Sequence, residues 1–223
     1  MATLYSIHPD NPQSRTIDQI KNALQGGAVM LYPTDTVYAI GCDLFSKSAV
    51  QRVRQIKQLS NDKPLTFLCS SLSSIAQYAV VHDSAYRIMR RLIPGPYTFL
   101  LPATKLVPKL VMNPRRRTTG IRVPDHPISM ALLEALGNPI ISTSAPLLMN
   151  GDLVNEPVAK PDSGTSRFDL FDCLEKLVDV IVDSGTEPGF HVSTILDLTE
   201  EEPIIVRRGL GWEEVSSWLV EAG

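Results

Sequence analysis

Residues 28–41 read Ala-Val-Met-Leu-Tyr-Pro-Thr-Asp-Thr-Val-Tyr-Ala-Ile-Gly, an apolar run followed at once by hydroxyl side chains. The run Ala28–Tyr32 is short, continuous and ended by Pro33, which is typical of a buried strand. Just upstream, Thr16–Leu24 carries apolar residues at helical spacing and stops before Gly26, a common residue at the end of a helix. This stretch therefore predicts a helix, a turn and a buried strand, with polar side chains where the strand ends.

The alternation of helical and extended patterns continues along the chain. Ser46 is placed to be the N-cap of a helix that carries Val50 and Val53 inward. We expect further helices over Ser84–Leu92, Pro127–Leu136 and Glu213–Ala222. We expect further strands over Leu65–Cys69, Tyr97–Leu101, Gly120–Val123, Pro139–Ser142, Val178–Val182, Ser193–Leu198 and Ile204–Arg207. Strands that alternate with helices predict an α/β domain built on a mixed sheet.

The composition is that of a globular protein. The 223 residues are 43% hydrophobic, enough apolar material to bury a sizeable core, which excludes a wholly disordered chain. The formal charge is −3, so a polyanionic partner would have to be met by a local basic cluster. Three widely spaced cysteines form no disulfide framework, and no segment has the pattern of a secretory signal or of a membrane span. We expect a cytoplasmic protein without a membrane partner.

Several familiar catalytic motifs are absent from the sequence. It contains no phosphate-binding P-loop, no dinucleotide-binding glycine pattern and no nucleophile elbow. The four histidines have none of the spacings found in zinc hydrolases, so we expect no protein-held metal. The long segment Ala145–Ser166 lacks apolar periodicity and is interrupted by proline and glycine, which is typical of either a lid or a disordered tether. We favour a flexible lid, because polar motifs flank this segment on both sides.

Hydroxyl and cationic residues gather at the ends of several expected strands. The segments are Pro33–Gly41, Thr118–His126, Ser142–Ala145, Ser193–Asp197 and Arg207–Gly209. In an open α/β sheet ligands collect where strands end and their connections diverge. Hydroxyl donors beside arginine suit a small anion with carboxylate or phosphate oxygens. Each cluster alone is better explained as turn and helix capping, but five of them in one chain favour a ligand site.

The ordered series of these motifs resembles the YrdC-like family of threonylcarbamoyl-AMP synthases, and within it the YciO-type branch. The resemblance covers about residues 16–209. It rests on Pro33–Tyr38, Lys57 with Lys63–Leu65, Pro94–Thr98, Gly120–Pro127, Ser142–Ala145, and Ser193–Asp197 with Arg207. It implies one domain over 1–223, with a single twisted open mixed sheet, flanking helices, a concave basic-lined face, and a C-terminal helix within 210–223.

The resemblance also implies an activity. Family members join L-threonine, bicarbonate and ATP into threonylcarbamoyl-AMP and pyrophosphate, for the threonylcarbamoyladenosine modification of tRNA. On the threonine side the implied residues are Thr36, Tyr38, Arg122, Ser142 and Ser193. On the nucleotide side they are Lys57, Lys63, Thr118, Ser144 and Arg207. Magnesium accompanies ATP and is carried by its phosphates, and the reaction needs aligned reactants and neutralised charge more than a protein nucleophile.

Two positions depart from the family pattern, both on the nucleotide side. The usual K-x-R is Lys57-Gln-Leu59, and the usual S-A-N is Ser144-Ala-Pro146. Arg54, one helical turn before Gln58, is a candidate substitute for the missing arginine. Two other functions therefore stay open: a diverged RNA- or nucleotide-binding homologue without synthase activity, or a hydrolase of threonylcarbamoylated substrates. For contact with tRNA or double-stranded RNA, the candidate residues are Arg115, Arg116 and Arg117.

Overall fold

The computed structural model describes residues 1–60, 64–149, 152–154 and 166–219. The strands of the main sheet are β1 (Thr3–Ser6), β2 (Val29–Tyr32), β3 (Ala39–Asp43), β4 (Thr66–Leu68), β5 (Tyr97–Pro102), β6 (Thr118–Arg122), β7 (Ile140–Ser144), β10 (Val180–Asp183), β11 (Thr194–Asp197) and β12 (Ile204–Arg207). The helices are α1 (Ser14–Gln25), α2 (Lys47–Ile56), α3 (Leu72–Tyr78), α4 (Asp83–Leu92), α5 (Pro127–Leu136), α6 (Arg167–Leu174) and α7 (Trp212–Leu219).

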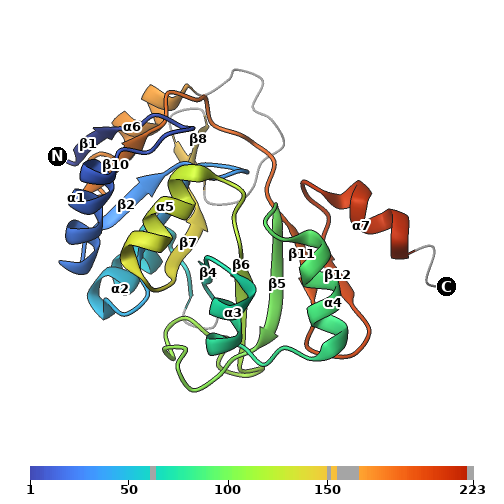
Figure 1. The fold of residues 1–223 in the computed structure, drawn as a ribbon. Helices are drawn as coiled ribbons and strands as arrows, with labels where there is room; N and C mark the ends of the chain where they lie inside the picture. The colour runs from blue at the N-terminus through green and yellow to red at the C-terminus, as the bar shows by residue number, and fades with distance from the viewer. Residues whose placement is uncertain (61–63, 150–151, 155–165, 220–223) are drawn as a thin grey trace.

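Within the described residues, ten strands form one sheet in the order β1-β10-β2-β3-β7-β4-β6-β5-β11-β12 (Figure 1). The neighbours β1 and β10, β10 and β2, β4 and β6, and β5 and β11 run parallel. The other neighbours run antiparallel. The sheet is therefore mixed and open, and the predicted α/β fold class is confirmed.

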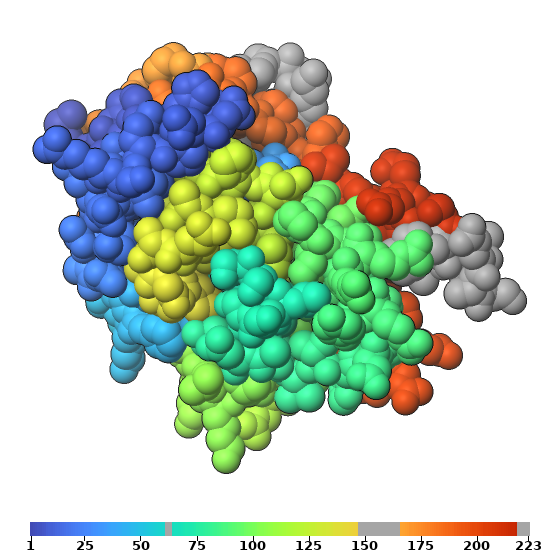
Figure 2. All heavy atoms as spheres, in the orientation of Figure 1, coloured from blue at the N-terminus to red at the C-terminus, as the bar shows by residue number. Residues whose placement is uncertain are grey.

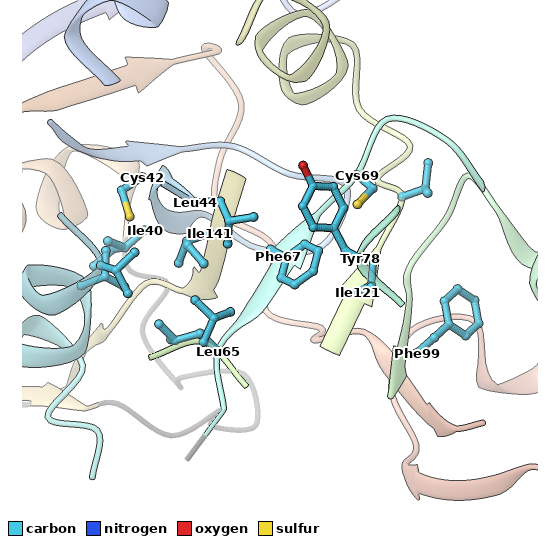
Figure 3. Packing of buried hydrophobic residues seen from close by; sticks show 14 of the residues in the cluster. Ile40, Cys42, Leu44, Leu65, Phe67, Cys69, Tyr78, Phe99, Ile121 and Ile141 are labelled. Atoms are coloured by element: carbon cyan, nitrogen blue, oxygen red, sulfur yellow. The ribbon is translucent and has the colours of Figure 1, made fainter. Parts of the chain in front are cut away.

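Helices pack on both faces of this sheet. α1 and α5 lie side by side (Figure 2). They pack over Met30, Tyr32 and Ile140 and close a smaller core. The larger core lies on the opposite face, where α2, α3 and α4 meet the sheet. There the rings of Phe67 and Tyr78 stack edge to face with their centroids 5.7 Å apart (Figure 3). Because side chains alternate along each strand, a polar residue between two core residues must face the opposite side of the sheet.

Most of the predicted elements are present. Ser46 accepts a hydrogen bond from the Ala49 amide at the start of α2, so the predicted N-cap is confirmed. α5 has the predicted bounds and ends at Gly137, which takes a left-handed conformation with φ of 73°. Four elements of the main fold were not predicted: β1, β3, α3 and α6. β1 lies upstream of residue 16 and pairs with β10, so the sheet extends beyond the stretch that carries the family motifs.

The segment expected to form a lid contains two short strands, β8 (Leu147–Met149) and β9 (Asp152–Val154), paired antiparallel. Most of the remaining segment, residues 155–165, lies outside the described residues. The predicted lid motion therefore stays a prediction. Among the helices of the described chain, none has the length and apolar character needed to cross a bilayer.

Gly41 allows the closest approach between strands in the middle of the sheet. A Cβ atom at this position would lie 2.6 Å from the carbonyl oxygen of Ile141 and 2.7 Å from the ring of Tyr32. Both distances are shorter than van der Waals contact, and the Ile141 carbonyl is part of the backbone. Gly41 is therefore required by packing, because β3 pairs with β7 at this point.

We predict that Gly41→Ala lowers the free energy of unfolding by about 2–3 kcal/mol, because overpacking a rigid site forces the backbone to move. Gly137→Ala is the control, since a Cβ there meets open space and only the left-handed φ is strained, at about 1 kcal/mol. Urea unfolding of both variants and the parent measures the difference. An equal loss in the free energy of unfolding of the two variants would show that crowding at Gly41 does not destabilise Gly41→Ala.

Candidate functional site

A cavity of about 310 Å³ opens on the face of the sheet that carries the smaller core. Ala39 and Leu68 belong to that core and also line the cavity, which places the cavity beside α1 and α5. Two arginines, Arg122 and Arg207, line it together with hydroxyl side chains: Thr34, Thr36, Thr66, Thr98, Ser142, Thr143, Ser144 and Ser193. Among the described lining residues none is acidic. The cavity therefore offers cationic and hydroxyl donors, the groups that suit a small anion.

Strand register brings the two arginines to one cavity. Thr98 on β5 pairs with Ile195 on β11, and Ile195 pairs with Arg207 on β12. On the other side of β5, the register that pairs Phe99 with Ile121 places Thr98 opposite Arg122 on β6. Arg122 and Arg207 are thus three strand spacings apart, about 14 Å at the backbone. Long side chains that converge over Thr98 and Ile195 leave room for an anionic group between them.

Three interactions fix the guanidinium of Arg122, whose side chain is 8% exposed. Its Nη1 donates to Thr36 Oγ1 at 2.8 Å, and its Nε donates to the Gly95 carbonyl at 3.2 Å. Its Nη2 lies 2.5 Å from Asp35 Oδ1 and forms an ion pair. A guanidinium has five N–H donors, so these interactions leave N–H groups for a ligand in the cavity. The planar group is held in one orientation, as bidentate recognition of a carboxylate requires.

Arg207 is held differently, by the backbone. Its Nε and Nη2 donate to the Ser193 carbonyl at 3.0 and 2.8 Å, and Nη2 also reaches Ser193 Oγ at 3.1 Å. Ser193 Oγ lies in turn 2.8 Å from Thr98 Oγ1. Burial lowers the pKa of Arg207, and the like charge of Arg122 lowers it further. An anion bound between the two guanidinium groups would relieve that repulsion.

Thr36 Oγ1 keeps acceptor capacity toward the cavity. Thr34 Oγ1 donates to the Val37 carbonyl at 2.6 Å and accepts from the amides of Thr36 and Val37 at 3.2 and 3.3 Å. Its proton and both lone pairs are then used, so its 3.0 Å contact with Thr36 Oγ1 does not fix the Thr36 proton. Thr36 Oγ1 accepts from Arg122, which leaves it one lone pair toward the cavity. It can therefore receive an N–H group of a ligand.

The structure gathers most of the predicted site residues. Thr36, Arg122, Ser142, Ser144, Ser193 and Arg207 all line the cavity. Thr118 shares the cavity-facing side of β6 with Arg122, by strand alternation, but lies beyond the lining residues. Lys63 falls outside the described residues.

Tyr38 and Lys57, like Thr118, do not line the cavity, and their roles in binding stay predictions. The ring of Tyr38 packs edge to face on Phe171 at 5.7 Å, and its hydroxyl lies 3.4 Å from Ser184 Oγ. Tyr38 therefore belongs to the larger core, where its apolar ring is buried. Lys57 caps the C-terminal end of α2 and is 4% exposed. Burial lowers the pKa of Lys57 to about 8.

The position where the family pattern has an arginine is apolar here. Leu59 lines the cavity beside Pro64 and Leu65. Arg54, the candidate substitute, is buried, where it donates to the Leu110 carbonyl at 3.1 Å and to the Ser60 carbonyl. Arg54 therefore stabilises the loop after α2 and does not line the cavity.

The three arginines proposed for RNA contact lie in the exposed turn before β6. Arg116 Nη2 forms an ion pair with Asp197 at 2.8 Å, so part of its donor capacity is used within the protein. Arg115 and Arg117 are exposed beside it. Their contact with RNA stays a prediction. Elsewhere in the described chain no cluster of three or more histidine, cysteine or acidic side chains is placed to hold a metal ion.

Sequence analysis missed four hydroxyls that line the cavity, Thr34, Thr66, Thr98 and Thr143, and the counter-ion Asp35. A signal for Thr98 was present: Tyr97 and Phe99 belong to the core, so alternation puts the residue between them on the opposite face. By the same alternation, Thr66 faces away from the core that contains Phe67. Asp35 had no comparable signal, because its partner is 87 positions away in the chain.

The chain is thus an α/β protein with an open mixed sheet and a cavity lined by arginine and hydroxyl side chains. Residues 22–209 match the Sua5/YciO/YrdC family, whose description reads "Telomere recombination". The chain belongs to this family.

Two relatives show where the chain lies within it. The Escherichia coli protein YciO is 41% identical over 95% of this chain and 97% of its own length. The crystal structure of E. coli YciO superimposes with a TM-score of 0.82, again over 95% and 97% of the two chains. A threonylcarbamoyl-AMP synthase of Pyrococcus abyssi is 29% identical over 89% of this chain and 55% of its own. The structure of P. abyssi Sua5 complexed with L-threonine has a TM-score of 0.81 at 25% identity, over 97% and 60% of the chains.

We predict that Asp35→Asn lowers the free energy of unfolding by about 3 kcal/mol, because the buried guanidinium of Arg122 loses its counter-ion. The control is Asp18→Asn, which breaks an exposed i, i+3 pair with Lys21 and should change stability by less than about 1 kcal/mol. Urea unfolding at neutral pH compares the two. If both variants lose the same small amount, Asp35 does not neutralise Arg122.

A second prediction concerns Lys57. Because burial lowers its pKa from 10.5 to about 8, the folded state binds fewer protons than the unfolded state between these pH values, and stability rises with pH across that window. Lys57→Met removes this titration. As the pH rises from 8 to 10.5, the free energy of unfolding of the parent should therefore rise by about 3 kcal/mol relative to that of Lys57→Met. Unfolding measured from pH 7 to 10.5, with exposed Lys105→Met as control, tests it, and a difference that does not vary with pH would contradict it.

Proposed function

We propose that this chain binds L-threonine and magnesium-ATP in the cavity and, with bicarbonate, forms threonylcarbamoyl-AMP and pyrophosphate. Membership of the Sua5/YciO/YrdC family supports the proposal, as does a threonylcarbamoyl-AMP synthase among its relatives. The threonine named in the Sua5 complex supports the amino-acid half of the ligand. In this proposal the adenylate serves the threonylcarbamoyl modification of tRNA.

The observation that carries the proposal is the pair of arginines across one cavity. Arg122, held in one orientation, would bind a carboxylate, and Arg207 would bind a phosphate. Thr36, an acceptor toward the cavity, would receive an N–H of the threonine amine. One ligand with an amine, a carboxylate and a phosphate satisfies all three groups.

The proposed chemistry requires orientation and charge neutralisation. The threonine amine attacks CO₂ derived from bicarbonate and loses a proton, which gives a carbamate. A carbamate oxygen then attacks the α-phosphorus of ATP, and the bond to the β-phosphate oxygen breaks so that pyrophosphate leaves. The residues of the cavity would hold the carbamate and the α-phosphate in line. Guanidinium groups fixed at the cavity would stabilise the charge that develops on the phosphate oxygens.

A second function, binding of a threonylcarbamoyl ligand without synthesis, is favoured by one observation. Leu59 supplies an apolar wall where the family pattern supplies an arginine, and Arg54 is committed to backbone carbonyls. A hydrogen bond to a charged group contributes about 1.5–3 kcal/mol. Loss of one such bond to the triphosphate would weaken ATP binding by about 10- to 150-fold. Synthesis would then be slow while binding of the adduct persists.

We predict that the protein, given ATP, magnesium, L-threonine and labelled bicarbonate, forms labelled threonylcarbamoyl-AMP detectable by mass. Arg122→Leu and Arg207→Leu should each reduce the rate at least about 10-fold, because each removes a charged donor from the reacting groups. Arg52→Leu is the matched control, since its ion pair with Asp179 lies at the surface. Adduct binding without product formation would favour the second function, and the absence of both would contradict the proposal.

A further inference from the structure

Tyr32 lies beneath the cavity and touches one of its polar residues. It comes from β2, is fully buried, and directs its hydroxyl to Ser142 Oγ on β7 at 2.8 Å. β3 lies between those two strands, so the ring must cross it. Gly41 of β3, which pairs with Ser142, provides the space, because a Cβ there would meet the ring at 2.7 Å.

The direction of this hydrogen bond determines what Ser142 can offer a ligand. The phenol of Tyr32 is the stronger acid of the two hydroxyls, and the contact is aligned for it to donate. Burial raises the pKa of Tyr32 well above its ordinary value, so the phenol keeps its proton. Ser142 Oγ is therefore the acceptor, and its own proton remains for another partner. Ser142 lines the cavity, where a ligand oxygen can take that proton.

We infer that Tyr32 is a positioning residue that makes Ser142 a hydrogen-bond donor toward an oxyanion of the ligand. The inference rests on the proposed function for the identity of that ligand. It gives the cavity a hydrogen-bond donor at Ser142, in addition to the acceptor capacity that Thr36 keeps. A ligand that carries an oxyanion matches this donor.

The alternative is that the Tyr32 hydroxyl only satisfies a buried polar group. In that case Tyr32→Phe would affect stability and any ligand affinity equally whether or not Ser142 is present. If Tyr32 acts through Ser142, its effect on affinity must vanish once Ser142 is replaced by alanine. A double-mutant cycle of Tyr32→Phe and Ser142→Ala separates the two cases.

The experiment measures binding of L-threonine and, separately, of inorganic phosphate by calorimetry to the full chain, the two single variants and the double variant. We expect Tyr32→Phe to weaken L-threonine binding about 5-fold and Ser142→Ala about 10-fold, with no further loss in the double variant. Tyr97→Phe is the matched control. It removes a hydroxyl that bonds Glu214 at 2.8 Å and lies on the opposite face of β5 from Thr98. Urea unfolding of each variant confirms that it is folded.

The outcomes separate the inference from the proposed function. The inference is overturned if Tyr32→Phe weakens binding equally in the parent and in Ser142→Ala. It is also overturned if the loss of affinity is no larger than that caused by Tyr97→Phe. Either result leaves threonine binding by the parent intact. If the parent binds phosphate but not threonine, the proposed function is wrong, and the phosphate affinities decide the inference by the same criterion. Binding of neither probe contradicts both.

Discussion

The guanidinium of Arg122 is a buried charge, and the arrangement of the site depends on how that charge is satisfied. A charge removed from water needs an opposite charge and hydrogen bonds around it, or it destabilises the fold by several kcal/mol. Asp35, Thr36 and the Gly95 carbonyl supply them from the loops after β2 and α4. These loops and β6 are distant in sequence, so the same interactions that satisfy Arg122 hold the cavity wall together. The ligand site and the stability of the fold are thereby coupled.

The sheet contributes a second constraint, which is close packing below the cavity. The larger core fills the opposite face with interlocking aromatic and aliphatic side chains, and this fixes which residues of β4, β5 and β6 face the ligand. Gly41 lets the ring of Tyr32 pass under β3 to Ser142. A hydroxyl that lines the cavity is therefore oriented by a residue two strands away. The direction of the hydrogen bond at Ser142 is in this way a consequence of packing in the core.

Much of the fold and part of the site could be predicted from the sequence. Apolar periodicity and capping residues located α1, α2, α4 and α5, because these signals are local. Strand-end hydroxyls and arginines indicated Thr36, Arg122, Ser144 and Arg207, which do line one cavity. Tyr38 could not be placed, since its contact with Phe171 comes from α6, an element that sequence analysis missed. Contacts between residues far apart in the sequence, such as those of Asp35 and Arg54, leave no local pattern from which to predict them.

The central claim is that Arg122 and Arg207 bind the anionic groups of the two reactants in one cavity. A crystal structure of the protein with L-threonine and a non-hydrolysable ATP analogue tests it most directly. We expect the amino-acid carboxylate on the N–H groups of Arg122 and phosphate oxygens within hydrogen-bond distance of Arg207. Ligands bound on any other surface, with the cavity between β6 and β12 left empty, would contradict the account.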